Sequence, residues 1–268
     1  MSSLVTTSAV ILRAYRYSET SKIVRLATRD LGVQSAIAKG ALRPKSRFGA
    51  GLELLSEGVA QLYYRESRDL QTLAAFDVEH LRRGLTTDVA RFAGGAALAE
   101  IMLRMAPPAP LPAAYDVFTR YLDSLATAPE SDVDATAVRG LWVLMGVLGF
   151  EPSLGTCVRD DTPITVTGSE PVIFSSAEGG VICPACVHAQ PPETSSRLPP
   201  QAYHDLTALV SPVAALPLFD HLHAAAHRRL VSRYAHYHLD ASASADGKGS
   251  LPALEFWERR AWLPGAAS

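Results

Sequence analysis

This sequence of 268 residues has few of the features that mark secreted, membrane-spanning or disulfide-bonded proteins. It has only three cysteines, and two of them form a C-x-x-C pair, which suits metal or redox chemistry in a reducing compartment better than a disulfide framework. No apolar run approaches the roughly eighteen residues of a membrane span, and the N-terminus has no signal-peptide pattern. We therefore expect a cytoplasmic protein that does not bind a membrane.

Motifs for catalysis are also missing from the sequence. It contains no G-x-x-x-x-G-K-[ST] loop, no H-E-x-x-H or G-x-S-x-G pattern and no dinucleotide fingerprint. Acidic residues are scattered and form no paired motif of the kind that nucleases use. The sequence therefore predicts a protein that is not an enzyme.

Positive charge is concentrated near the N-terminus, although the whole chain carries a formal charge of -2. Residues 13–47 contain nine Lys or Arg residues and only two acidic ones, a net charge of +7, so the rest of the chain carries -9. Self-repulsion makes such a block costly unless a polyanion or an acidic partner neutralises it, so nucleic acid is the first expectation. A solvated basic face without a ligand is the alternative, and charge alone does not separate the two.

Eight residues of this block are the predicted nucleic-acid contacts. Gly40 and Pro44 indicate an irregular, exposed loop, where binding residues tend to gather. Tyr15, Tyr17 and Phe48 are candidate rings for base stacking, although we expect at least one of them to pack in the core. The predicted contacts are Arg13, Arg16, Lys22 and Arg25 on strands, and Lys39, Arg43, Lys45 and Arg47 in the loop.

Five short segments within about the first eighty residues have the composition of β-strands. They lie at residues 10–12, 23–26, 33–37, 57–64 and 70–76. No long helix separates them, which indicates a small antiparallel barrel or sandwich. A five-stranded barrel with a basic, loop-bearing face is the architecture of OB-folds, which bind oligonucleotides. The sequence thus predicts an α+β protein with a five-stranded OB-type barrel over residues 1–82.

Beyond about residue 84 the apolar residues recur at three- and four-residue steps, which predicts helices. A Thr-Thr-Asp start signal at 86–88 precedes the first helix, and the proline-rich segment 106–112 ends it. Its predicted core stripe is Val89, Phe92, Ala96, Ala99 and Leu103. Further stripes at 117–125 and 138–148 predict two helices that pack on each other, the second ending near Gly149.

A C-terminal helix is expected from about residue 217 to 239. Its predicted apolar stripe is Phe219, Leu222, Ala226, Leu230 and Tyr234. His223 and His227 are four residues apart, a spacing that can bind a metal, but without a third ligand we expect both to face solvent. The small, polar segment 240–250 predicts a flexible linker.

Three cysteines and one aspartate have the spacing of a structural zinc site. Cys183 and Cys186 form the C-x-x-C pair, and Cys157 and Asp160 form a second pair with the same spacing. Zinc accepts carboxylate oxygen, so Asp160 is the first choice of fourth ligand, and His188 or a water is the second. A finger that folds without metal is the alternative. A redox pair or a nucleophilic Cys186 is less favoured, because no thioredoxin-like context precedes it.

Two sets of spaced residues stand out along the chain. The N-terminal set is Tyr15-x-Tyr17-x-Glu19-x-Ser21-x-Ile23-Val24, Thr28-x-x-x-Gly32 and Lys39-Gly40-Ala41-x-Arg43-x-x-Ser46. The second set is Leu148-Gly149-Phe150-x-Pro152-x-Leu154-x-x-Cys157 and Gly179-Gly180-x-x-Cys183-x-x-Cys186. Together they frame most of the chain, and in this order they resemble the bacterial RecO recombination-mediator family. This sequence departs from the family pattern at Asp160, where the second family cysteine is missing.

The resemblance implies an OB-fold over residues 1–82 and a helical domain over 83–268, with a zinc-finger-like insertion at about 155–190. It implies a nucleoid-associated factor that binds single-stranded and duplex DNA, anneals single strands and helps to load a recombinase in DNA repair. RecR and single-strand binding protein are the implied partners. The alternative is a zinc-ribbon interaction module whose basic block docks an acidic protein. Single-strand affinity with a steep salt dependence would favour the first function.

Overall fold

The computed structural model describes residues 3–49, 51–242, 250–260 and 262, and the chain divides into two compact units, Met1–Thr127 and Ala128–Ser268. Most of the linker predicted at 240–250 lies outside the described residues. The first five elements are strands, and helices follow them, so the predicted α+β class is confirmed. The predicted domain boundary between residues 82 and 83 stays a prediction.

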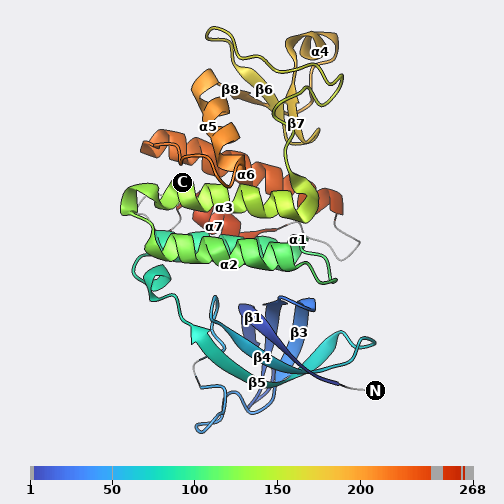
Figure 1. Cartoon of the computed structure of the whole chain (residues 1–268), viewed down its shortest axis with the longest axis vertical. Coiled ribbons are helices and arrows are strands. Elements are labelled where there is room, and N and C mark those ends of the chain that lie inside the picture. The colour runs from blue at the N-terminus through green and yellow to red at the C-terminus, as the bar shows by residue number, and fades with distance from the viewer. Residues whose placement is uncertain (1–2, 50, 243–249, 261, 263–268) are drawn as a thin grey trace. The chain divides into compact units, whose positions relative to one another are not determined.

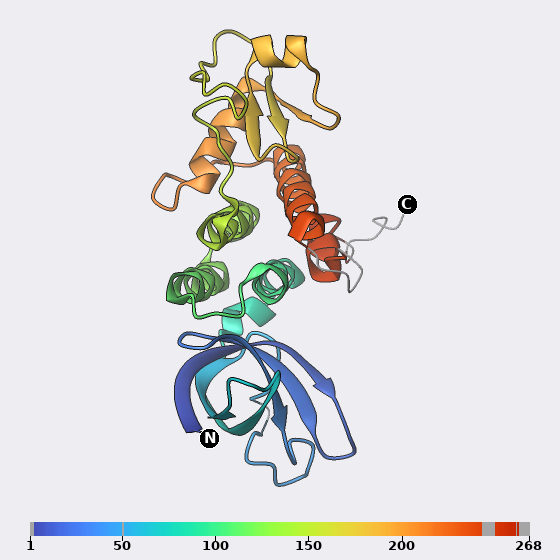
Figure 2. The ribbon, with the colours of Figure 1, turned by 90° about the vertical axis from the view of Figure 1, so that its right-hand side faces the viewer.

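Five strands form a closed barrel in the first unit (Figure 1). They are β1(Ser3–Arg16), β2(Lys22–Thr28), β3(Gly32–Ala38), β4(Glu57–Tyr64) and β5(Leu70–His80). The strand order is β1-β2-β3-β5-β4, and β4 pairs back with β1. All pairs are antiparallel except β3 with β5. Figure 2 shows the strands curving around a common interior. The predicted five-stranded OB-type barrel is confirmed.

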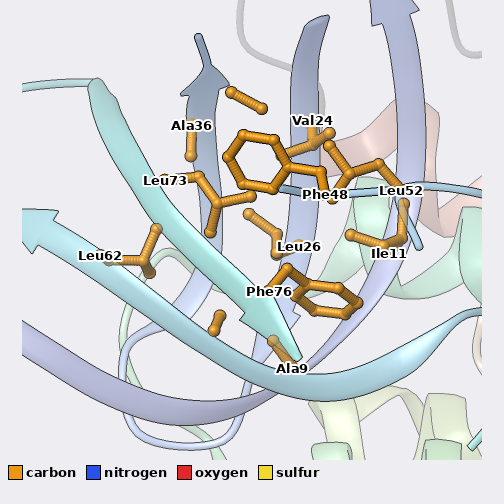
Figure 3. Packing of buried hydrophobic residues seen from close by; sticks show 12 residues of the cluster. Ala9, Ile11, Val24, Leu26, Ala36, Phe48, Leu52, Leu62, Leu73 and Phe76 are labelled. Carbon is orange, nitrogen blue, oxygen red and sulfur yellow. The ribbon is translucent and has the colours of Figure 1, made fainter. Parts of the chain in front are cut away.

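Apolar side chains that alternate along the strands fill the barrel (Figure 3). Val24 and Leu26 of β2 are fully buried in this core, whereas Arg25 between them is only partly buried. Phe48 and Leu52, from the connection between β3 and β4, enter the same core. The basic block, residues 13–47, therefore also contributes core residues such as Val24 and Leu26.

Two helices complete the first unit. A 3-10 turn, η1(Arg83–Thr86), leads from the barrel to α1(Val89–Met105), and α2(Pro112–Thr127) follows the proline-rich connection. Asp88 caps α1, because its side chain accepts a hydrogen bond of 2.9 Å from the Arg91 backbone N–H. The predicted start signal and the predicted end of this helix are thus confirmed.

The core stripe predicted for α1 is wrong in its first turns. Val89 and Phe92 are 47% and 38% exposed, while Leu98 is fully buried. Gly95 lies on the packed side, where a Cβ would be 2.8 Å from the Leu55 side chain. Alanine and glycine make α1 apolar on most sides, so the spacing of large apolar residues does not identify the side that packs.

The second unit is built around a buried helix. A 3-10 turn, η2(Glu130–Asp132), opens α3(Val133–Met145), and a π-helical turn, Gly146–Phe150, ends it. Gly149 has φ +94°, which agrees with the predicted stop. The further helices of this unit are α4(Pro184–Ala189), α5(Pro200–Val210), α6(His221–Ser242) and α7(Pro252–Glu258). Within the unit, α3 packs against α5 and α6.

Among the described residues, Glu130–Phe150 is the one segment long and apolar enough to span a membrane, with a mean hydropathy of 1.4. However, 67% of its apolar window is buried inside the protein, as is typical of a core helix. The Trp142 ring packs on Phe174 and Tyr234, with ring centroids 6.4 and 4.9 Å away. We therefore assign this segment to the core of the second unit.

The chain segment between α3 and α5 forms a small sheet with the cysteines, and Figure 1 shows it on the side of α5 away from α3. Its strands are β6(Val172–Ser175), β7(Gly180–Ile182) and β8(Ser196–Leu198), in the order β7-β6-β8, and α4 follows β7. The apolar cluster around the cysteines has only three buried members, Cys157, Ile182 and Cys183. We call residues 155–190 the cysteine insertion.

The apolar stripe predicted for α6 is only partly right. Tyr234 is buried as predicted, but Leu222 and Ala226 are exposed. Arg228 is 5% exposed instead, and its Nη1 lies 3.0 Å from Oδ2 of Asp134 in α3. An ion pair allows a charged side chain to occupy the packed side of a helix, which apolar periodicity cannot indicate.

The prediction that His223 and His227 both face solvent is wrong for His227. This ring is 2% exposed and is stacked on Phe219, with ring centroids 4.9 Å apart. Its Nε2 lies 4.0 Å from Oδ2 of Asp205, beyond hydrogen-bond distance. Burial lowers the pKa of His227 to about 4, although Asp205 acts in the opposite direction. His223 is exposed and lies 3.0 Å from Asp220.

Candidate nucleic-acid interface and metal centre

The four basic residues predicted on strands fall into two pairs. Arg13 lies directly opposite Arg25 in the β1–β2 pair, and Arg25 alternates with core residues. Opposite residues of an antiparallel pair share a face, so both arginines lie on the outer face of the barrel. Arg16 lies opposite Lys22, which lies opposite Ala38 of the core. Arg16 and Lys22 therefore belong to the inner side of the sheet, at one end of the barrel.

The loop that follows β3, residues 39–49, begins at this same end, which we call the loop end (Figure 2). The Arg43 N–H donates to the Gly40 carbonyl oxygen at 3.1 Å, and Gly40 has a φ of +75° that favours glycine. The Leu42 N–H donates to the Thr20 carbonyl oxygen at 3.0 Å, which holds the loop beside the β1–β2 turn. All four predicted loop residues are exposed: Lys39, Arg43, Lys45 and Arg47.

The loop end thus brings together six of the eight predicted basic residues, namely Arg16, Lys22, Lys39, Arg43, Lys45 and Arg47. Lys22 pairs with Glu53, with 3.0 Å between Nζ and Oε1. Within the described part of the chain, no ion pair joins the other five to a carboxylate. An exposed cluster of cations with so few acidic neighbours attracts polyanions.

Two of the three predicted stacking rings are accessible. Tyr15 and Tyr17 are 46% and 60% exposed, whereas Phe48 is 3% exposed and belongs to the barrel core. The Arg47 guanidinium carbon lies 5.1 Å from the centroid of the Phe48 ring. The expectation that at least one ring packs in the core is confirmed, and Phe48 is that ring.

One further basic residue, absent from the sequence prediction, joins the outer face. Arg104, in the last turn of α1, lines an open cavity of about 710 Å³ with Arg13, Tyr15, Arg25 and Leu103. Among the described residues, the buried Nε of Arg25 has no hydrogen-bond partner. Burial lowers the pKa of Arg25, Tyr15 acts against this shift, and Arg13 adds to it. No sequence signal identifies Arg104, because only the fold brings α1 to β1 and β2.

The cysteine insertion brings together the four predicted metal ligands. The ligand atoms of Cys157, Asp160, Cys183 and Cys186 all lie within 4.8 Å of one another. A turn in which the Asp161 N–H donates to the Cys157 carbonyl oxygen, at 3.0 Å, brings Asp160 to the cluster. Cys183 precedes α4, and its Sγ accepts a hydrogen bond of 3.4 Å from the Cys186 N–H. The C-x-x-C and C-x-x-D turns therefore face each other.

Hydrogen bonds within the cluster shift the ionisation of its members. Burial raises the pKa of Cys157, but hydrogen bonds from the backbone, above all at Cys183, outweigh this effect and lower it. Hydrogen bonds with the Cys157 side chain and the Thr162 backbone lower the pKa of Asp160. A hydrogen bond with Asp160 raises the pKa of Cys186 to about 12. Metal coordination requires thiolates, so a bound ion would displace the thiol protons.

The donor set fits a metal ion in a closed, four-ligand site. Three thiols and one carboxylate are ligands that zinc accepts, and four protein ligands are typical of its structural sites. Arg159 supports the site: it donates to the Cys186 carbonyl oxygen at 3.0 Å and pairs with both carboxylate oxygens of Glu178. His188, the second choice of fourth ligand, is not a member of the cluster.

Comparison with known proteins matches both parts of the chain to one family. Residues 1–82 match the family described as "Recombination protein O N terminal", and residues 86–244 match "Recombination protein O C terminal". Similar curated proteins bear the name "DNA repair protein RecO". That of Salinibacter ruber is 34% identical over 207 residues, which covers 75% of each chain. That of Rubrobacter xylanophilus is 32% identical over 209 residues, covering 78% of this chain and 80% of the relative.

Proposed function

The chain belongs to the RecO family of DNA repair proteins, and we propose that it binds and anneals single-stranded DNA as a recombinase-loading mediator. One observation carries this proposal: six exposed or partly exposed basic residues gather at the loop end of a closed OB-type barrel. OB-folds bind oligonucleotides with their loops and one strand face. The barrel, residues 1–82, would bind DNA, and residues 83–268 would form the helical domain that carries the cysteine insertion.

The proposed mechanism is annealing without catalysis or nucleotide hydrolysis. Two single strands repel each other through their phosphates, and a basic surface that neutralises both raises their local concentration. Base pairing then provides the free energy of the reaction. The rest of the chain, with a formal charge of -9, would repel DNA and orient the encounter. RecR and the acidic tail of single-strand binding protein are the proposed partners, in the cytoplasm at the nucleoid, and duplex DNA is a further proposed ligand.

We further propose that the cysteine insertion binds one zinc ion through Cys157, Asp160, Cys183 and Cys186. The proximity of the four ligand atoms and the soft thiol donors support zinc. The ion would have a structural role, because a site with four protein ligands leaves no open position for a substrate.

The test of the annealing function is a strand-annealing assay with fluorescent complementary oligonucleotides, with and without ATP. We expect acceleration that needs no ATP, is largest at low salt and fades as salt competes for phosphates. Acceleration that requires ATP, or no acceleration at any salt, would contradict the proposal. A salt-insensitive complex with an acidic protein and no DNA binding would favour the interaction module instead.

A further inference from the structure

The register of the barrel strands places two rows of residues next to each other on its outer face. The first, which we call the arginine row, consists of Arg13 opposite Arg25, followed by Ser35 and Leu70. The second, which we call the ring row, lies two residues further along each strand. From β1 across the barrel to β4 it consists of Tyr15, Ile23, Ile37, Thr72 and Tyr63. A tyrosine therefore stands at each end of the ring row, and Tyr63 is 51% exposed.

The arginine row ends at the cavity between the barrel and α1. Arg13 and Arg25 line it, and within the described residues neither forms an ion pair with a carboxylate. Like charges directly opposite each other in a sheet are destabilising, and partial burial of Arg25 strengthens this effect. Arg104 brings a third guanidinium to the same cavity. An anion bound in the cavity would remove the repulsion between the two opposed arginines.

We propose that this cavity binds one backbone phosphate of a single strand, of which one base stacks on Tyr15 beside the cavity and another on Tyr63 at the far end of the ring row. The inference rests on the proposed DNA-binding function and deepens it by assigning the strand a path. Guanidinium groups match phosphate oxygens in geometry, and Tyr15 lies both at the cavity and at the start of the ring row. Exposed rings beside cations are how proteins bind single strands, whose bases are free to stack. The paired bases of a duplex are not available in this way.

The test compares Arg13→Gln/Arg25→Gln with the matched control Arg83→Gln/Arg120→Gln, which removes the same charge from exposed sites of the same unit. Fluorescence anisotropy of a labelled oligo-dT is measured over a range of salt concentrations. We expect the cavity variant to bind at least about tenfold more weakly at low salt, with a salt slope lower by about 0.7 because one phosphate contact is lost. The control should keep the salt slope of the wild type. The cavity variant should also keep or raise the melting temperature, since it loses a like-charge pair.

Substitutions in the ring row test the path of the bases. Tyr15→Ala and Tyr63→Ala should each weaken oligo-dT binding about 5- to 100-fold, while Phe at either site should retain it. The affinity for duplex DNA should not change. If the wild type binds oligo-dT and the cavity variant binds it equally well, the inference is wrong. If the wild type binds no oligo-dT at any salt, the proposed function itself fails. An oligo-glutamate peptide that displaces oligo-dT from the wild type at lower concentration than unlabelled oligo-dT would assign the cavity to an acidic protein partner.

Discussion

The barrel and the cysteine insertion organise their functional groups in opposite ways. The barrel core contains twelve buried residues inside a closed ring of hydrogen-bonded strands, and its basic residues lie outside that core. The insertion has strands of three or four residues, and two of its three buried cluster members are cysteines. In the barrel, the packed residues and the proposed binding residues are different. In the insertion the candidate metal ligands are themselves part of the core.

The arrangement of charge differs in the same way. The cations of the loop end face solvent and, Lys22 apart, have no carboxylate partner within the described residues. The donors of the insertion face one another within 4.8 Å. The barrel should therefore fold without its ligand, whereas the insertion should depend on its ion.

The largest expected effect is that of metal removal on the insertion. Protein purified without chelator should contain about one equivalent of zinc, and chelation should speed hydrogen exchange across residues 155–190 but not in the barrel strands. Structural zinc in small domains contributes on the order of 10 kcal/mol, far more than the few apolar contacts here. Absence of zinc, or an equal increase of hydrogen exchange in the insertion and in the barrel, would contradict the expectation that only the insertion depends on a metal ion.

Variants of the fourth ligand sharpen this test. Asp160→Cys should restore a four-cysteine site and tighten zinc binding, while Asp160→Ala should weaken it. His188→Ala is the matched control and should leave the affinity unchanged, because His188 is not in the cluster. Competition with a chromophoric chelator measures all three affinities. A larger loss of zinc affinity in His188→Ala than in Asp160→Ala would identify His188, and not Asp160, as the fourth ligand.

The second prediction concerns the barrel core. Leu62→Ala should lower the free energy of unfolding of the barrel by about 2–5 kcal/mol, since Leu62 is fully buried. The control Leu4→Ala, at a site 54% exposed, should change it by less than about 0.5 kcal/mol. Hydrogen exchange of the barrel strands in increasing denaturant measures both. The loss of unfolding free energy should be the same with and without chelator. A loss that depends on metal would contradict the expectation that the barrel is stable without the metal site.

The third and smallest effect is the acid sensitivity of the second unit. His227 has a pKa of about 4 when folded, below the unfolded value near 6.5, so the unfolded chain binds more protons between these pH values. Neutral His227 therefore makes its full contribution to the free energy of unfolding above about pH 6.5. This contribution falls as the pH falls toward 4, by roughly 3 kcal/mol at most. Two neighbours also affect the pKa of His227: Asp205 raises it and His223 lowers it. The free energy of unfolding of His227→Gln should depend less on pH than that of the exposed control His223→Gln. Equal pH dependence in the two variants would show that His227 is not the source of the acid sensitivity.

The sequence predicted the elements well and the contacts between distant elements poorly. The strands, the start of α1 at Asp88 and the stop at Gly149 follow from local patterns and were predicted. The buried face of α1 depends on its packing against elements elsewhere in the chain, such as the approach of Gly95 to Leu55, and these contacts have no local signal. The C-x-x-C spacing identified all four members of the metal cluster, because a turn of fixed length brings its two ends together.

The same difference applies to the nucleic-acid interface. Composition alone identified the basic loop, and strand alternation separates Arg13 from Lys22. The position of Arg104 at the cavity depends on helix packing. The placement of Tyr15 and Tyr63 at the two ends of the ring row depends on strand register. A single sequence contains no pattern that predicts strand register or helix packing.

We propose that the barrel binds DNA through its loop end, and the salt dependence of single-strand affinity is the decisive measurement. We compare the full-length wild type, Arg43→Ala/Lys45→Ala/Arg47→Ala, and a control with the same loss of charge, Arg29→Ala/Arg83→Ala/Arg120→Ala, whose sites are exposed and outside the loop end. We expect the loop variant to lose roughly two to three units of salt slope and the control less than about one. Equal slopes in the two variants, with both folded, would contradict it.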